Sequence, residues 1–358
     1  MGSNALSPVE IQRWTRIGVL AALAILLGYL EAFLPIPIPG VKLGLANIAV
    51  LAALANHDIS GAFCISLIKV LVLGLLFGSP LTLAYSAAGT LLAFCGMAIL
   101  SLLPSMHLVM VSVVGAILHE IGQLFVAQAM LGTTAVWYLA PVLLVAGCVT
   151  GAICGVLAGR LDDSLANKDA TAAVATASVS EVSARPLRRS SAWLLICLIA
   201  FVVVIFRVDD VRVLGALAAL GLVLCALTRV HPKRLLRSMA PLLALVVVTL
   251  AIQLVVSPQT ALEQTARSSL RLLSVATACA AFMAYVPTSD LTALVARLAT
   301  PLKRLGIQSD GFVLALDVAL RLVPTMEGLI ELQGLQLRDV PQLIPRAYER
   351  LLARVSER

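Results

Sequence analysis

Three prolines at alternate positions mark the stretch from Glu31 to Asn47, which reads EAFLPIPIPGVKLGLAN. Proline lacks a backbone N–H and fixes φ, so this stretch cannot continue a helix and we expect a stiff loop between two apolar segments. Lys42 and Asn47 follow it at the mouth of the next segment. Two interpretations stay open. Either the loop covers a pocket in which Lys42 receives an anionic or carbonyl group, or Lys42 only extends its ammonium group to the membrane interface.

Lys69 stands in the middle of the apolar run ISLIKVLVLG. A lysine at the centre of a membrane helix costs about 2.5–3.5 kcal/mol on insertion scales, so it must face a pocket, a carboxylate or another helix. A purely structural ion pair would satisfy this requirement. We favour the interpretation that Lys69 lines a functional cavity.

Small and polar residues share one side of the apolar segment 108–131, and branched apolar residues occupy the other. Small and polar side chains are expected to face the helix bundle, with the branched side, including Val111, facing lipid. The sequence HEIGQ has Gln123 where the zinc motif H-E-x-x-H needs a second histidine, so a zinc protease site is excluded. A ligand pocket and polar helix–helix contacts both stay open. The polar side comprises Ser112, Gly115, Ala116, His119, Gln123 and Ala127, with Glu120 beside it.

The composition is that of a helical membrane protein. Hydrophobic residues make up 60% of the 358 residues and charged residues only 13%, whereas soluble proteins have about 25% charged residues. The apolar runs are about 17–25 residues long, which suits membrane helices rather than barrel strands. The net charge of +7 fits basic cytoplasmic loops, and basic–aromatic patterns typical of nucleic-acid binding do not occur. The seven cysteines form no C-x-x-C pair and are expected to be packed, reduced thiols.

The order of apolar and polar segments predicts ten membrane spans. Arg13 and Arg16 precede the first, which places the N-terminus in the cytoplasm. Residues 162–191 are rich in Ala, Ser and Thr, and predict a flexible cytoplasmic linker between modules at 1–161 and 192–358. Both termini are then cytoplasmic, and the proline-rich loop is extracellular. The spans lie near 16–34, 43–56, 60–78, 80–103, 108–131, 138–159, 192–206, 213–228, 239–256 and 269–286.

The stretch from Pro287 to Asp339 changes from apolar to amphipathic. Apolar residues recur at helical spacing, so we expect helices at about 289–305 and 312–338. Asp317 and Arg321 are four residues apart and can pair on one face of the second helix. The pattern favours helices lying on the lipid surface over a platform for a soluble partner.

Small residues recur at four-residue spacing in the first span, as Gly18 with Ala22 and Ala24 with Gly28. This spacing allows another helix to approach closely. Packing within the first module and docking on another subunit both fit it.

The N-terminal module resembles the Gx transporter family, whose members are often labelled heptaprenyl diphosphate synthase component I. The resemblance rests on LEAFLPIPIPGVKLGLANIAVLAAL, FGSPLTLAYSAAGTLL and GAILHEIGQLFVAQAML. That family is similar to the substrate-binding S components of energy-coupling factor (ECF) transporters. Neither a P-loop nor a complete D-D-x-x-D motif occurs in the chain. The sequence therefore contains no motif for the prenyl-synthase activity that the family label implies.

Residues of about 190–340 resemble the transmembrane T component of the same transporters. The resemblance rests on HPKRLLRSMAPLL, SLRLLSVATACAAFMAYVPTSDLTALVARLATPLKRLG and LALDVALRLVPTMEGLIELQGLQLRD. T components insert two coupling helices, each ending in an Ala-Arg-Gly-like motif, into grooves of two ATPases. Here Arg338 keeps the arginine of the first motif without its small neighbours. The second motif is not recognisable in PQLIPRAYERLLARVSER, where Arg350 or Arg354 could replace its arginine.

Together the two resemblances imply a fused substrate-binding and energy-coupling subunit of an ECF-type ABC transporter in the cell membrane. It would move a vitamin-like or other small molecule and contact membrane lipid. Two ABC-type ATPase subunits would bind ATP and Mg²⁺. We expect this chain itself to have no enzyme activity and to bind neither a metal ion nor nucleic acid. The alternative is a non-catalytic membrane subunit associated with polyprenyl diphosphate or quinone synthesis. Expected substrate-binding residues are Glu31, Lys42, Asn47, Lys69, His119, Glu120 and Gln123, and expected ATPase-coupling residues are Arg321, Glu331 and Arg338.

Overall fold

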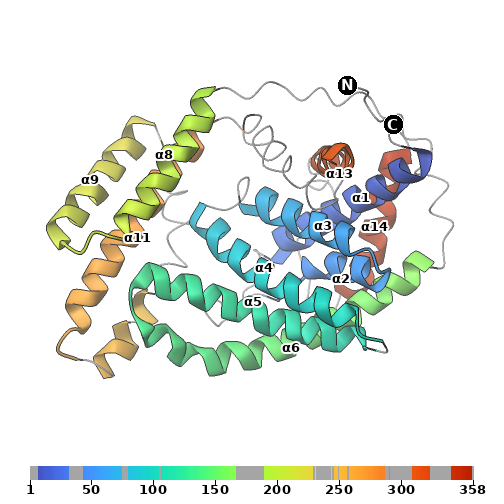
Figure 1. Ribbon diagram of the computed structural model, residues 1–358, viewed down its shortest axis with the longest axis horizontal. Coiled ribbons are helices and arrows are strands. Elements are labelled where there is room, and N and C mark those ends of the chain that lie inside the picture. The colour runs from blue at the N-terminus through green and yellow to red at the C-terminus, as the bar shows by residue number, and fades with distance from the viewer. Residues whose placement is uncertain are drawn as a thin grey trace.

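The fold is an assembly of helices, seen in a computed structural model of the chain (Figure 1). The structure describes residues 7–31, 43–74, 80–104, 106–166, 189–228, 258–286, 309–322 and 340–356, together with 230, 243, 246–248, 250–255 and 290. Regular structure in these ranges is helical throughout. The helices are α1 (Pro8–Glu31), α2 (Asn47–Ala55), α3 (Ile59–Val72), α4 (Pro80–Ser101), α5 (Leu108–Leu131), the 3-10 helix η2 (Thr134–Leu139), α6 (Ala140–Ala166), α8 (Arg189–Ile205), α9 (Val211–Leu227), α11 (Ala261–Tyr285), α13 (Ser309–Leu322) and α14 (Val340–Ser356).

Five of these helical segments are long and apolar enough to cross a membrane: Pro8–Glu31, Thr82–Ser101, Leu108–Leu131, Thr134–Asp162 and Ala261–Tyr285. The shorter helices α2, α3, α8 and α9 correspond to four of the remaining predicted spans, with α2 the shortest at nine residues. The span predicted at 239–256 lies partly outside the described residues. A helix that is apolar all round must be buried, and residues Ile48 to Leu54 of α2 are all enclosed. The chain is therefore a polytopic α-helical membrane protein. Helix α6 continues to Ala166 and α8 begins at Arg189, inside the bounds predicted for the linker.

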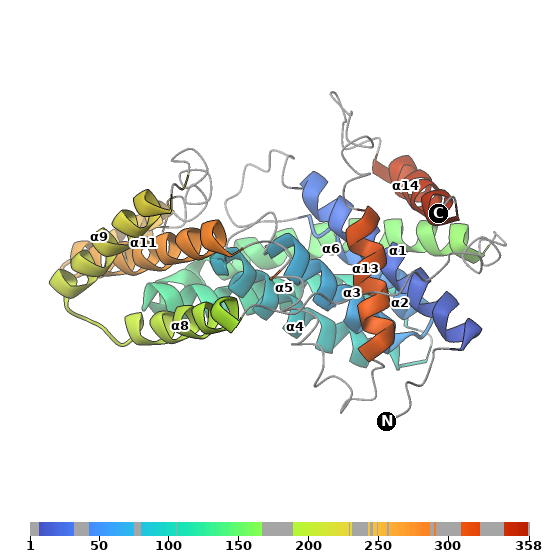
Figure 2. The ribbon, with the colours of Figure 1, turned by 90° about the horizontal axis from the view of Figure 1, so that it is seen from above.

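Two hydrophobic cores hold the helices together, and each contains residues from both halves of the chain. One core joins α1, α2, α3 and α6 to α13 and α14. The other joins α5, η2 and α6 to α8, α9 and α11. Figures 1 and 2 agree in placing α8, α9 and α11 at one end of the molecule and α1, α13 and α14 at the other. The N-terminal half thus packs against the C-terminal half at both ends.

Helix α13 packs against α1, and small residues on both helices let the two approach closely. A β-carbon at Gly18 would stand 2.8 Å from Val318 Cβ and 2.9 Å from the Ala315 carbonyl oxygen. One turn earlier, the buried Trp14 ring lies against Gly311. Figure 1 shows α13 nearly end-on while α1 runs across the view, so the two helices cross at this contact. We call the contact of Trp14 and Gly18 with Gly311, Ala315 and Val318 the inner contact.

The small residues in α1 pack within this chain at both positions, and docking on another subunit stays a prediction. Gly18 meets α13 of the C-terminal half. Gly28 lies instead against Leu73 and Ala46, within the N-terminal half. Helix α1 therefore has close neighbours on both sides, and it presents little surface to lipid.

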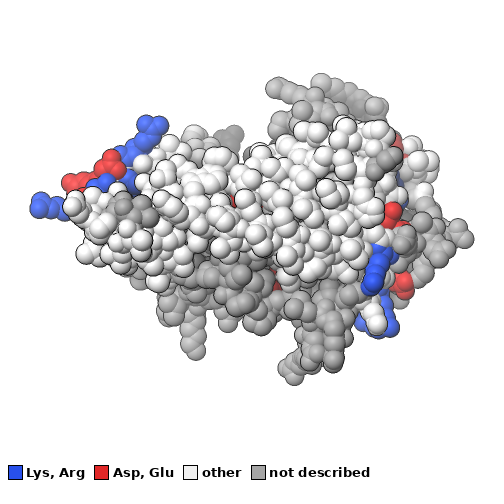
Figure 3. All heavy atoms as spheres, turned by 90° about the horizontal axis from the view of Figure 1, so that it is seen from below, with Lys and Arg blue, Asp and Glu red and all other residues white. Residues whose placement is uncertain are grey.

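Polar contacts between loops occur on two sides of the helices. On one side Arg13 pairs with Asp58 and Asn56 donates to Asp162, at 2.6 and 2.7 Å. On the other side Arg271 pairs with Asp209 at 2.7 Å. The orientation of these groups in a membrane stays a prediction, and we name them the inner and outer sides after the predicted cytoplasmic and extracellular loops. Figure 3 shows the charged side chains gathered at two ends of the molecule, with an uncharged surface between them.

The Arg13–Asp58 ion pair connects the start of α1 to the start of α3. Arg13 Nη2 lies 2.6 Å from Asp58 Oδ1, and Arg13 Nε lies 3.0 Å from Oδ2, so the pair is bidentate. Asp58 also accepts from the Gly61 N–H at 2.8 Å and so caps α3. Burial of Asp58 would raise its pKa, but these hydrogen bonds and the Arg13 charge outweigh burial and lower the pKa below its ordinary value.

We predict that Gly18→Leu separates α1 from α13. The new side chain would meet Val318 and the Ala315 backbone, and overpacking of this kind costs about 1–3 kcal/mol of unfolding free energy. The melting temperature of the purified protein in detergent measures the effect. Gly215→Leu in α9 is the matched control, because a β-carbon there meets no atom within 4 Å. Equal melting temperatures for the two variants would contradict the close packing.

The Arg13–Asp58 pair should also make stability depend on acid pH. The folded pKa of Asp58 is depressed, so its contribution is present above the unfolded value of about 4 and is lost as pH falls through the folded pKa. Asp58→Asn keeps a cap but removes the charge. We expect the variant to melt below the wild type at pH 7, with the difference shrinking below about pH 4. A difference that stays constant down to pH 3 would rule out the ion pair as its source.

Candidate functional site

Glu31 closes the proline-rich loop. The loop residues 32–42, with Lys42 among them, lie outside the described residues. On either side of them, the two Glu31 oxygens accept from the N–H groups of Gly44 and Leu45, at 2.9 and 3.0 Å. Gly44 has φ of +75°, a left-handed conformation that favours glycine, so the chain can turn here toward the carboxylate. The last residue of α1 therefore anchors the chain just before α2.

Lys69 reaches across from α3 to the first residue of α2. Its side chain is only 4% exposed, and its Nζ donates to Asn47 Oδ1. A cation at a buried position in a membrane helix needs such acceptors, because the surrounding hydrocarbon offers none. The structure therefore brings together Lys69 and Asn47, two of the predicted substrate-binding residues.

Cys154 of α6 completes this polar cluster. Its thiol donates to the Leu43 carbonyl at 3.1 Å, and Glu31 and Lys69 are both close enough to interact electrostatically with it. Sequence reasoning treated all cysteines as packing residues, and nothing in the spacing of Cys154 distinguishes it from the others. We call Glu31, Asn47, Lys69 and Cys154 the polar cluster.

Three members of the polar cluster lie several helical turns from the inner-side loops. Asn47, Lys69 and Cys154 are 9, 11 and 8 residues from the inner-side residues Asn56, Asp58 and Asp162. At 1.5 Å per residue, these separations correspond to roughly 12–17 Å, about half of a hydrocarbon core of ~30 Å. These three side chains are therefore held away from the inner-side loops, within the helical part of the N-terminal half.

A second polar group lies on α5 between α4 and α6. His119 Nε2 and Gln123 Nε2 are 2.8 Å apart, and the His119 ring lies against Gly89 of α4. Glu120 is 4% exposed and lies beside Gly147 of α6. Gly147 precedes Cys154 by seven residues, or roughly 10 Å along α6 toward the outer side. His119, Glu120 and Gln123 therefore lie about two helical turns above the polar cluster.

The lipid-facing side predicted for α5 is partly wrong. Phe125 is 56% exposed, as predicted, but Val111 is 2% exposed and belongs to the first core. Helix α5 packs closely against two helices, with Gly122 on α4 and Gly151 of α6 on Val113. Because α5 has two close neighbours, more of its circumference is buried than the single polar side that the sequence pattern indicated.

The predicted coupling residues are only partly described. Arg321 pairs with Asp317 at 2.6 Å on α13, which confirms the predicted pairing. Its side chain is 48% exposed. Glu331 and Arg338 lie outside the described residues, as does the expected helix at 289–305 apart from Asp290.

Helix α14 forms the region in which the second coupling motif was not recognisable. It packs Leu351 and Tyr348 inward, and burial raises the pKa of Tyr348 although Arg16 on α1 opposes this. Arg346 and Arg350 are exposed on the opposite face. The helix is therefore amphipathic, with its apolar face on protein and an arginine-bearing face outward.

The described residues contain no cluster of three or more His, Cys, Asp or Glu side chains that could hold a metal ion. What the described site offers is a buried cation with amide, carboxylate and thiol neighbours. Such an arrangement can bind and orient a polar molecule.

We predict that removing Asn47 destabilises the protein more than removing Lys69. Asn47→Leu takes an acceptor from a buried ammonium group, which costs about 1–3 kcal/mol. Lys69→Met removes the buried charge itself, so we expect an unchanged or higher melting temperature. Melting temperatures of both variants and the double variant measure the coupling. Greater loss for Lys69→Met would show that Lys69 serves mainly as a structural ion pair.

Comparison with known proteins supports the N-terminal resemblance. Residues 20–161, which are 142 of 358 residues, match the family described as heptaprenyl diphosphate synthase component I. No curated protein and no solved structure matches the chain. The matched residues include the whole polar cluster and the α5 group, so both lie in an S-component-like region. The T-component resemblance of the C-terminal half stays a prediction.

Proposed function

We propose that the chain is a fused substrate-binding and energy-coupling subunit of an ECF-type transporter in the cell membrane, with both termini cytoplasmic. The observation that carries this proposal is the inner contact. It joins α13, from the stretch predicted to couple to ATPases, directly to the first half of α1. The same helix continues into the region that matches the family model from residue 20 onward. Movement of α13 would then act on the substrate-binding half without an intermediate subunit.

The substrate-binding half would hold a vitamin-like or other small molecule at the polar cluster. Lys69 and Asn47 offer a donor and an acceptor, while Glu31 fixes the loop that precedes α2. Lys42, on that loop, would contribute a further cation. His119, Glu120 and Gln123 lie on the outer side of the cluster, where an incoming molecule would meet them first. These roles combine a few placed polar groups with apolar walls, as small-molecule sites usually do.

The C-terminal half would transmit work from two ATPases of the ABC type, which would bind ATP and Mg²⁺. Arg338 would enter one ATPase, with Glu331 and Arg321 on the same stretch. The exposed arginine face of α14 is our candidate for the second contact, since Arg350 lies there. Arginine suits this role because its planar fork can bind carboxylates bidentately.

The alternative is a non-catalytic membrane subunit associated with polyprenyl diphosphate or quinone synthesis. The printed description of the matching family favours it. It would require a soluble synthase as the partner in place of ATPases. The two proposals therefore differ in which protein binds the inner side.

Affinity purification of the tagged full chain from its native membranes separates the two proposals. We expect mass spectrometry to find ABC-type ATPases with the wild type, and at least about tenfold less with Arg338→Glu, because losing one partner of a buried interface charge pair costs about 2–5 kcal/mol. Arg267→Glu on the outer side is the control and should change nothing. Recovery of a soluble prenyl synthase without any ATPase would contradict the transporter proposal and favour the alternative.

A further inference from the structure

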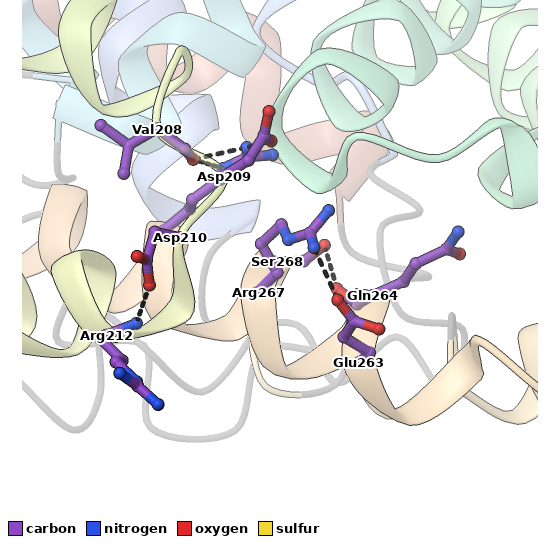
Figure 4. A network of polar contacts seen from close by, with 9 residues as sticks. Val208, Asp209, Asp210, Arg212, Glu263, Gln264, Arg267 and Ser268 are labelled. Carbon is purple, nitrogen blue, oxygen red and sulfur yellow. Dashed lines mark hydrogen bonds and ion pairs between the residues drawn. The ribbon is translucent and has the colours of Figure 1, made fainter.

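Ser66 of α3 is a buried serine whose hydroxyl has no hydrogen-bond partner in the described part of the chain, although only 3% of the residue is exposed. A serine inside a helix can donate to the carbonyl four residues earlier. Ser268 of α11, which is 4% exposed, does so, since its hydroxyl donates to the Gln264 carbonyl oxygen at 2.8 Å (Figure 4). It also donates to the carbonyl of Leu131 at the end of α5. Ser66 makes no such bond, and a buried hydroxyl left unsatisfied lowers stability, so it calls for a functional explanation.

The Ser66 side chain lies on the same side of α3 as Lys69. The two residues are three positions apart, and side chains at this spacing are neighbours on a helix surface. Leu73, four residues after Lys69, meets Gly28 of α1 and Ala46 just before α2. The side of α3 that carries Ser66 and Lys69 therefore faces the junction of α1 and α2, where the polar cluster lies.

The acceptor oxygens of the polar cluster already accept hydrogen bonds within the N-terminal half. Both Glu31 oxygens accept from backbone N–H groups, and Asn47 Oδ1 accepts from Lys69. Lys69 itself can only donate, because an ammonium group has three N–H donors and no acceptor. Any group of a bound molecule that meets both Ser66 and Lys69 must therefore be an acceptor.

From this arrangement we propose that Ser66 is a further binding residue beside the polar cluster, and that Ser66 and Lys69 together receive an acceptor oxygen of the bound small molecule. The Ser66 O–H and the Lys69 ammonium group both donate to a carboxylate or to a neutral carbonyl group, because each of these groups has at least two lone pairs. An amine does not fit this position, since its N–H groups would meet those of Lys69. The inference rests on the proposed function only in that the N-terminal half binds a small molecule.

Removal of the Ser66 hydroxyl should stabilise the ligand-free protein. The full chain is purified in detergent, and retained molecules are removed by repeated dialysis. We expect Ser66→Ala to melt roughly 1–3 °C above the wild type, because it removes an unsatisfied buried polar group. Ser268→Ala is the matched control, since Ser268 is equally buried but its hydroxyl is bonded, and it should melt below the wild type. An unchanged or lower melting temperature for Ser66→Ala would overturn the inference, because the hydroxyl would then be satisfied without a bound molecule.

The same variant should bind its small molecule less tightly although it is more stable. Freshly purified full chain from native membranes is denatured, and mass spectrometry measures the molecules that it releases. We expect Ser66→Ala to release roughly three- to tenfold less per protein than the wild type, as the loss of one hydrogen bond predicts. Ser268→Ala should release as much as the wild type. Fragment spectra of the released molecule should show a carboxylate or a neutral carbonyl group, and they distinguish the two.

Two further results would overturn the assignment of Ser66. One is equal release from Ser66→Ala and the wild type, and the other is a released molecule with neither a carboxylate nor a carbonyl oxygen. If the wild type releases no molecule, the assignment fails together with the substrate-binding part of the proposed function. If release falls as expected but no ABC-type ATPase is recovered with the chain, Ser66 stands as a binding residue and the transporter proposal fails.

Discussion

The enclosure of α1 by both halves of the chain is the constraint on which the rest of the structure depends. Hydrocarbon cannot drive two membrane helices together as water does, so close association requires surfaces that fit. Gly18 provides such a surface for α13, and Gly28 provides one for α2 and α3. Helix α1 is therefore the element through which the two halves of the chain are packed together at this end.

The same helix carries the anchor of the proline-rich loop. Glu31, at the end of α1, holds Gly44 and Leu45 just before Asn47, which in turn accepts from Lys69. The inner contact at Gly18 and the anchor at Glu31 are 13 residues apart, roughly 20 Å along a rigid rod. Helix α1 therefore connects the predicted coupling region, which packs against it at the inner contact, to the polar cluster, which is hydrogen-bonded to its other end.

Much of the fold could be predicted from the sequence, because a bilayer demands long apolar helices and alternating loops. The buried position of Lys69 and its need for a partner were likewise predictable, since a charge at that depth cannot stay unsatisfied. The identity of the partner was not, because Asn47 lies 22 residues away and adjoins Lys69 only through the packing of α2 on α3. Cys154 and the contact of α11 with the end of α5 escaped prediction for the same reason, as both depend on distant helices. Val111 was placed on lipid because a single stripe cannot reveal that α5 has two close neighbours.

The central claim is that the polar cluster binds a small molecule, and mass spectrometry of molecules retained by the full chain tests it most directly. The wild-type protein, purified from its native membranes in mild detergent, should release one polar small molecule upon denaturation. Lys69→Met should release at least about tenfold less while its melting temperature stays the same or rises, as expected when a binding cation rather than a structural ion pair is lost. Equal amounts of the same molecule from both proteins, or none from either, would contradict the account.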